Sequence, residues 1–132
     1  MPSYTTQEQV MFFDTDIGGV VHNIAYLRMI ETCRTMLAEQ VGFNLKQMAK
    51  TQVFPVVART EIDYRKPATL GDKLSILGQI TEHTRTAFWC EFEVRNQDSP
   101  DTLYVQCRQK LAVVQMPAGK PIRIPEEVLS HF

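Results

Sequence analysis

Residues 12–26 read FFDTDIGGVVHNIAY, and this stretch is the most informative part of the chain. Apolar residues lead into two carboxylates placed two positions apart, Asp14 and Asp16, and a pair of glycines follows. An apolar-striped segment typical of a helix then begins. A carboxylate can attack a carbonyl carbon or activate water, and the unpaired N–H groups of a helix start can stabilise an oxyanion. The stretch therefore carries the minimum equipment for acyl transfer.

Composition sets the broad class of the chain. The sequence has 132 residues, of which 44% are hydrophobic and 22% charged, with a net charge of −1. These values predict one globular domain over residues 1–132 and do not favour nucleic acid or an anionic membrane as a partner. No apolar run is long enough to span a bilayer, and the first residues lack a secretory signal pattern. With three widely spaced cysteines, we expect buried free thiols in a cytoplasmic protein.

The spacing of apolar residues predicts an α+β chain. Tyr26, Ile30, Cys33, Leu37 and Val41 recur at steps of three or four, which indicates one buried helical face from 23 to about 41. The other expected elements are a strand over 4–13, a short helix over 44–50, strands over 53–65, 74–80, 88–94 and 103–113, and a helical turn over 126–131. One strand, one long apolar helix and four further strands predict an antiparallel sheet that wraps the helix.

With its elements in this order, the chain resembles the hotdog-fold acyl-CoA thioesterases of the 4-hydroxybenzoyl-CoA thioesterase type, and in particular their YbgC-like branch. The resemblance rests on residues 13–26, on Glu31 and Arg34 in the helix, and on residues 59–74, which are similar to that family's second strand and turn. It extends over nearly the whole chain. It implies a hotdog fold, in which a five-stranded antiparallel sheet is wrapped around one long central helix.

The resemblance also implies a mechanism and a set of partners. Asp16 matches the family's catalytic carboxylate, acting as nucleophile or general base, and the N–H groups of Val21, His22 and Asn23 would stabilise the oxyanion. The expected substrate is a small or medium acyl-CoA, aliphatic or aromatic, with acyl carrier protein as an alternative carrier. No metal or other cofactor is expected. Because the family pairs its sheets edge to edge, we expect a homodimer or homotetramer with active sites at the dimer seam.

The chain departs from the family pattern at His22-Asn23, where many YbgC-like members have Tyr-His. The imidazole is shifted by one place, so His22 is either a catalytic group or a neighbour of the helix cap. Asn23 suits the cap itself through its side chain. Asp14 is expected to be a turn acceptor, whereas Asp16 is expected to be partly buried.

Candidate substrate contacts come from several parts of the sequence. Three of them, Gly19, Tyr26 and Glu31, belong to the first turn and the helix, although an ordinary helical ion pair is the alternative for Glu31. The remaining candidates are cationic or polar residues that would contact the phosphates of coenzyme A, with solvated surface charge as the alternative. These are Arg59, Lys66, Thr84 and Arg85.

Other functional classes are less well supported. His22, His83 and His131 are scattered, without metal-ligand spacing, and neither a Gly-x-Ser-x-Gly motif nor a glycine-rich phosphate loop is present. The alternative that stays open is a non-catalytic hotdog protein that binds acyl-CoA or acyl carrier protein as a sensor. Such a protein normally carries an additional effector segment, and these residues provide none, which disfavours this interpretation.

Overall fold

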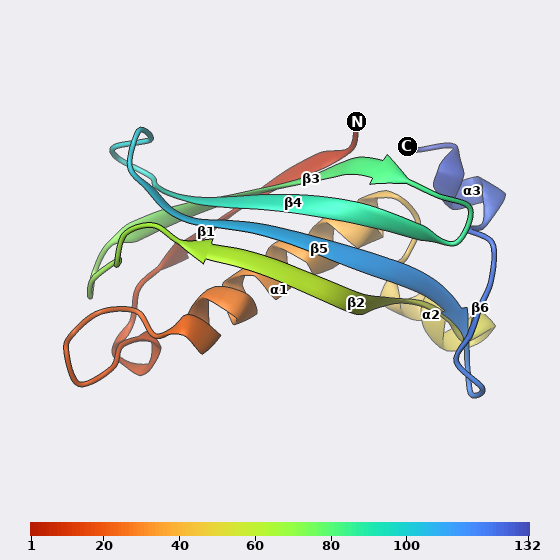
Figure 1. Ribbon diagram of the computed structural model, residues 1–132, viewed down its shortest axis with the longest axis horizontal. Coiled ribbons are helices and arrows are strands. Elements are labelled where there is room, and N and C mark those ends of the chain that lie inside the picture. The colour runs from red at the N-terminus through yellow and green to blue at the C-terminus, as the bar shows by residue number, and fades with distance from the viewer.

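The computed structural model describes all of residues 1–132 and shows one sheet with one long helix along it (Figure 1). Short helices lie beside the sheet at the end where α1 finishes. In chain order the elements are β1 (Ser3–Gln9), the 3-10 turn η1 (Phe12–Asp14), α1 (Asn23–Gln40), α2 (Leu45–Thr51), β2 (Val53–Tyr64), β3 (Lys73–His83), β4 (Ala87–Asn96), β5 (Leu103–Gln115), β6 (Lys120–Pro121) and α3 (Glu126–Leu129).

The sheet is antiparallel throughout, with the strand order β1-β3-β4-β5-β2. The strands form one curved layer, and α1 runs along one face of it (Figure 1). This is the predicted hotdog arrangement, and the fold prediction is confirmed. The two-residue strand β6, which pairs with the end of β5, was not predicted and makes the sheet six-stranded.

The core lies between α1 and the inner face of the sheet. The predicted stripe of α1 is buried, including Tyr26, Ile30 and Cys33, and the neighbouring Met29 is buried as well. The stripe packs against buried side chains of β3 and β4. Gly78 permits this close approach, because a Cβ at that position would lie 2.8 Å from Cε1 of Phe92 and 3.0 Å from Sγ of Cys33. The absence of a side chain at Gly78 therefore fixes how closely the sheet sits on the helix.

The first strand is shorter than predicted. It ends at Gln9 instead of continuing to Phe13, and residues 12–14 form a 3-10 turn. The backbone N–H of Met11 donates to Oδ2 of Asp14 (3.0 Å), which bends the chain away from the sheet. The bend leaves Phe12 and Phe13 exposed, at 81% and 76%. Apolar alternation alone does not reveal a side-chain hydrogen bond that competes with strand pairing.

Strand β2 lies at one edge of the sheet, and its inner face is only partly covered: Ile62 packs against the core, whereas other inward-facing residues are exposed. Helix α1 makes its main contacts with β1 and β3. Val57 and Thr60 pair with the buried residues Leu111 and Gln109, so they point toward the helix side, and yet both are exposed. We call the space between α1 and this inner face of β2 the trough.

All three cysteines are buried free thiols, as predicted. Burial raises the pKa of Cys90 to about 12 and that of Cys107 to about 11. The nearby Arg34 guanidinium lowers both pKa values, but by less than burial raises them. These thiols are therefore protonated at neutral pH. None of the helices has the length and apolar character that crossing a bilayer requires.

Candidate active site

The two carboxylates of the loop before α1 have opposite environments. Asp14 is buried: its Oδ2 accepts the Met11 N–H, its Oδ1 lies 3.9 Å from a guanidinium nitrogen of Arg28, and its carbonyl accepts the His22 N–H (3.0 Å). Asp14 is thus a turn acceptor, as predicted. Asp16 is exposed, so the prediction of partial burial is wrong for this chain by itself. The loop that carries Asp16 projects beyond the end of the sheet (Figure 1).

Only one of the two carboxylate oxygens of Asp16 is held by the turn. Its Oδ1 accepts the N–H of Gly18 (2.8 Å), and its carbonyl accepts the N–H of Gly19 (3.0 Å). Gly19 has a φ of +78°, a left-handed conformation that favours glycine at this turn. The second carboxylate oxygen, Oδ2, has no hydrogen-bond partner within the chain. The turn therefore orients the carboxylate and leaves one oxygen free.

The N-cap of α1 is His22, not Asn23 as predicted. Nδ1 of His22 accepts the N–H of Ala25 (3.1 Å), so Nε2 carries the ring proton and donates to the carbonyl of Phe13 (3.3 Å). Asn23 is the first helical residue, and its Oδ1 accepts the N–H of Ile24 (3.0 Å). His22 thereby joins the helix start to the loop that carries the carboxylates.

The three predicted oxyanion donors are not equivalent. The N–H of Val21 donates to the carbonyl of Ala68 (2.9 Å), and the N–H of His22 donates to the carbonyl of Asp14 (3.0 Å). The N–H of Asn23 has no acceptor in the chain. Only Asn23 therefore presents a free helix N-terminal donor.

Asp16 and Asn23 border the same open cavity, of about 360 Å³, at the N-terminal end of α1. Helix α1 and the end of β2 form its walls. Its lining residues are Asp16, Val21, His22, Asn23, Tyr26, Tyr64, Arg65, Lys66 and Pro67. The cavity brings together a carboxylate, a free N–H and two cationic side chains.

Tyr26 holds the far wall of this cavity. Its hydroxyl accepts the N–H of Ala68 (3.0 Å), and its ring lies 5.9 Å from that of Tyr64. Burial raises the pKa of Tyr26, so the phenol stays neutral at physiological pH. Because Ala68 also accepts the Val21 N–H, Tyr26 fixes the loop against which the helix start is placed.

Four predicted substrate contacts lie away from this cavity in a single chain. Thr84 and Arg85 are in the β3–β4 turn, at the opposite end of the sheet from the Asp16 loop (Figure 1). Arg59 is on the outer face of β2, where its Nε donates to Glu61 (2.9 Å). Glu31 is exposed on α1 and lies 3.6 Å from Arg34. Of the predicted cations, only Lys66 lines the cavity.

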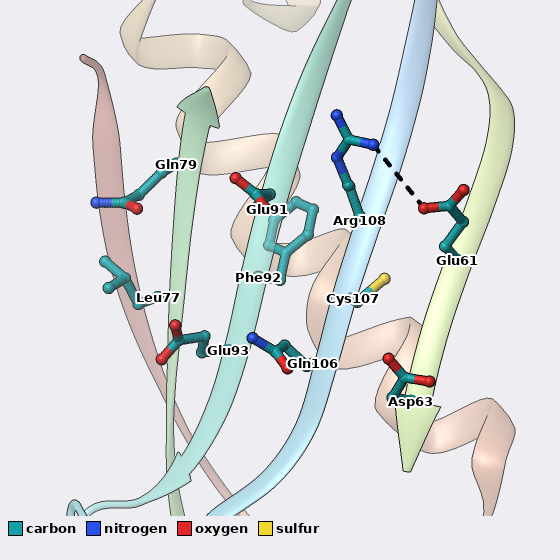
Figure 2. Close-up of a pocket in the computed structure, with 10 residues that line it drawn as sticks. All are labelled: Glu61, Asp63, Leu77, Gln79, Glu91, Phe92, Glu93, Gln106, Cys107 and Arg108. Atoms are coloured by element: carbon teal, nitrogen blue, oxygen red, sulfur yellow. Dashed lines mark ion pairs between the residues drawn. The ribbon is translucent and has the colours of Figure 1, made fainter. Parts of the chain in front are cut away.

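A second depression, of about 260 Å³, lies on the outer face of the sheet (Figure 2). Figure 2 shows carboxylates from β2 and β4 around Arg108, with the helix behind the strands. Arg108 pairs with Glu61 (3.9 Å) and Glu82 and lies 3.8 Å above the ring of Trp89. The four carboxylates of this lining, Glu61, Asp63, Glu91 and Glu93, would repel the phosphates of coenzyme A, so this depression is a poor candidate for the site.

Sequence reasoning missed one buried polar residue of the trough, Gln109. It occupies the inner face of β5 between Cys107 and Leu111 and is as buried as its apolar neighbours. A polar residue at an inward position of an alternating apolar strand is the signal that was available.

The comparisons with known proteins agree with the architecture described above. The acyl-CoA thioester hydrolase YbgC of Escherichia coli O6:H1 is 28% identical over 124 residues, covering 94% of this chain and 91% of that protein. The crystal structure of a probable thioesterase from Bartonella henselae has 28% identity and a TM-score of 0.83, covering 93% of this chain and 99% of that one. A 1,4-dihydroxy-2-naphthoyl-CoA thioesterase from Synechocystis has the same fold at 22% identity, with a TM-score of 0.87 and coverage of 97% and 93%.

The fold and the carboxylate-bearing loop before its helix define a protein of the hotdog class. A family model described as the thioesterase-like superfamily matches residues 10–132. The chain belongs to that superfamily, which confirms the family predicted from the sequence.

Proposed function

We propose that this protein hydrolyses acyl-CoA thioesters, with Asp16 as the reacting carboxylate and the N–H of Asn23 as the oxyanion donor. The observation that carries the proposal is that the free Oδ2 of Asp16 and the unpaired N–H of Asn23 belong to one cavity. The names of the relatives support it: one is an acyl-CoA thioester hydrolase and another acts on 1,4-dihydroxy-2-naphthoyl-CoA. Aliphatic and aromatic acyl groups are both within the proposed substrate range.

The proposed chemistry begins with the thioester carbonyl oxygen accepting the Asn23 N–H. Negative charge develops on that oxygen as the carbonyl carbon becomes tetrahedral, and the N–H stabilises it at the positive end of the α1 dipole. Asp16 either attacks the carbon, giving a mixed anhydride that water then cleaves, or removes a proton from the attacking water. In both routes the carbon–sulfur bond breaks, and coenzyme A leaves as a thiol once its sulfur is protonated. Every step is assigned to the carboxylate, the N–H and water.

His22 takes a positioning role in this proposal. Its Nδ1 caps α1 and its Nε2–H reaches the carbonyl of Phe13, so both ring nitrogens are occupied by the backbone. An imidazole held in this way fixes the position of the Asp16 loop relative to the start of α1. It has no free nitrogen for proton transfer to the substrate.

A second copy of the chain is part of the proposal. Strand β2 has a free edge and exposed apolar residues, which soluble monomers normally avoid. Further large apolar side chains are exposed in the segment around the cavity, namely Phe12, Phe13, Ile17 and Ile24. Antiparallel pairing of two β2 edges about a two-fold axis would continue the sheet and cover this surface. Light scattering should give at least twice the mass of one chain, and a monomer at micromolar concentration would contradict the dimer.

The same two-fold axis would complete the contacts with coenzyme A. It places the β3–β4 turn of the second copy, with its Thr84 and Arg85, toward the end of the sheet where this chain carries Asp16. Lys66 and Arg65 of this chain border the cavity directly. Replacing Arg85 with Ala should therefore raise KM more than it lowers kcat, with a smaller effect at high salt.

The decisive experiment measures release of free thiol from a panel of aliphatic and aromatic acyl-CoA thioesters. Asp16→Asn keeps the shape of the side chain and removes its charge, and we expect kcat to fall by about 10²–10⁴, the usual scale for one acid–base group. Asp14→Asn is the matched control, because its carboxylate has a structural role and its loss should lower stability more than turnover. Unchanged turnover of Asp16→Asn on every substrate would overturn the assignment. Tight binding of acyl-CoA by the parent without any hydrolysis would favour the sensor alternative.

A further inference from the structure

Arg34 is a mostly buried cation whose one ion pair is with an exposed carboxylate. Its side chain is only 18% exposed, although it extends from α1 toward β5 and the trough. Its nearest carboxylate is that of Glu31, 3.6 Å away and 65% exposed, so solvent weakens the attraction between them. A guanidinium has five N–H donors, and Arg34 uses one of them at short range, from Nη1 to Oε1 of Gln109 (2.7 Å). The charge and most of the donors are left for another acceptor.

Gln109 fixes the direction in which Arg34 points. Its amide is buried among apolar neighbours, where an unpaired polar group would be costly. Oε1 accepts from Arg34, and Nε2 donates to the hydroxyl of Thr60 on β2 (3.3 Å). The chain Arg34–Gln109–Thr60 therefore crosses from the helix to the inner face of β2.

Beyond this crossing lies a small apolar cavity of about 160 Å³, which Arg34 borders. No nitrogen of Arg34 is both fully buried and unpaired, so its spare donors remain accessible. The apolar members of the lining are Ala38, Phe43, Leu45, Met48, Phe54, Pro55 and Leu111. The polar members are Arg34, Thr35 and Glu39, so the apolar part of the lining complements alkyl carbon, and a terminal anion would have to bind at Arg34 on the side away from Glu39.

Arg34 borders this cavity, whereas Asp16 and Asn23 border the other one, and the two cavities have no lining residue in common. Asn23 and Arg34 are on the same helix, roughly 16 Å apart along its axis at about 1.5 Å per residue. Beside the helix, the floor of the trough is formed by the exposed inward-facing residues Tyr64, Thr60 and Val57. An acyl chain whose thioester lies at Asn23 would therefore reach Arg34 with its far end, provided that it is of medium length.

We propose that this protein accepts acyl groups that end in a carboxylate, with Arg34, held by Gln109, as the specificity-determining residue. The proposal rests on the thioesterase function proposed above and names a substrate class for it: the coenzyme A half-thioesters of medium-chain dicarboxylic acids. The planar guanidinium matches a carboxylate through two parallel hydrogen bonds. The terminal carboxylate would give Arg34 a second carboxylate besides the exposed Glu31, and the methylene chain would lie along the inner face of β2.

The test compares matched substrates that differ only at the far end of the chain. Suberoyl-CoA is measured against octanoyl-CoA, and sebacoyl-CoA against decanoyl-CoA, with kcat/KM from release of free thiol. For the parent we expect the ratio of kcat/KM to favour the dicarboxylic substrate at one or both lengths. Arg34→Met should lower that ratio by about tenfold to a hundredfold, the scale of a hydrogen bond to a charged group. Arg34→Lys should lower it less, because a charge remains without the planar fork.

Two further variants keep the test decisive. Gln109→Glu would supply Arg34 with a carboxylate from the protein itself, so this variant should also lose the preference. Lys46→Met removes an exposed cation of α2 that lines no part of the trough, and its ratio should equal that of the parent. If Arg34→Met does not fold, the ratio of the parent together with that of Gln109→Glu decides the question.

The outcomes separate the two proposals. If the parent hydrolyses octanoyl-CoA and decanoyl-CoA at least as well as their dicarboxylic partners, the inference about Arg34 is overturned and the thioesterase function stands. Equal losses on both members of a pair in Arg34→Met also overturn it, because they indicate a merely structural residue. If the parent hydrolyses no acyl-CoA at all, both proposals fail.

Discussion

Strands β3 and β2 have nearly the same length, and both direct apolar side chains toward the helix, but they end in opposite environments. On the inner face of β3, Leu74, Ile76 and Ile80 are 0% exposed, because α1 packs over them. On the inner face of β2, Val57 is 42% exposed. Periodicity therefore indicates which way a side chain points, but not whether the same chain covers it. The covered half of the sheet contributes most of the core, whereas the half at β2 keeps apolar side chains exposed.

The largest contrast between the two halves should appear in the free energy of unfolding. Phe92 is buried against Gly78 and the helix, and Phe92→Ala should destabilise the chain by about 3–5 kcal/mol through lost burial and the cavity left behind. Val57→Ala removes apolar atoms from an exposed position and should change the stability by about 0.5 kcal/mol or less. Urea unfolding of both variants measures the difference. Similar losses would mean that β2 is covered in the folded protein.

Alkaline pH should lower the free energy of unfolding, because two buried thiols lie in the covered half of the sheet. Folding raises the pKa of Cys90 to about 12 and of Cys107 to about 11 from a starting value of 9.0, so the unfolded chain gives up these protons first. Above pH 9 the unfolded state binds fewer protons than the folded state, and stability falls by about 1.4 kcal/mol per pH unit for each thiol until its folded pKa is reached. Below pH 9 the contribution is fully present. Cys107→Ala should show a shallower decline in urea titrations between pH 9 and 11 than the parent.

Tyr26→Phe tests the residue that lies between the core and the cavity lined by Asp16 and Asn23. Loss of the hydroxyl leaves the buried N–H of Ala68 without its acceptor, at a cost of about 1–3 kcal/mol. The loop at Ala68 also accepts the Val21 N–H, so kcat should fall as the helix start becomes less well positioned. Tyr4→Phe is the matched control, since Tyr4 lies on β1, lines no part of the cavity and has a hydroxyl without a partner in the chain. Equal effects of the two substitutions would contradict the role given to Tyr26.

The sequence predicted those features that depend on local pattern, and it missed those that depend on distant partners. The helical stripe, the strands and the turn role of Asp14 follow from residue spacing and type. The cap was assigned to Asn23 because its propensity is higher, whereas the bond that His22 makes to Phe13 depends on how the loop folds back. The sequence also does not show which N–H at the helix start is free. The N–H of Val21 is not free, because it donates to the carbonyl of Ala68, which is far away along the chain.

Tertiary topology explains the other differences from the sequence predictions. Arg85 is distant from the Asp16 loop both in sequence and in space. Within one chain the β3–β4 turn, which carries Arg85, lies at the far end of the sheet. Exposure of Asp16 likewise reflects a loop at the sheet end that nothing in the same chain covers. Both facts depend on where distant parts of the chain lie in the fold, and residue spacing contains no direct signal for them.

The smallest effect on the folded chain should come from Val57→Lys, although it tests the uncovered half most directly. Because Val57 is exposed, a lysine there can extend into water, and the free energy of unfolding of the isolated chain should change by about 0.5 kcal/mol or less. If two β2 edges pair, the substitution brings a charge and its symmetry-related copy into the seam, which should lower the mass measured by light scattering to that of a monomer. Thr5→Lys, on the exposed opposite edge strand β1, is the charge-matched control and should leave the assembly unchanged. An unaltered dimer in Val57→Lys together with a dissociated Thr5→Lys would show that β1, and not β2, forms the seam.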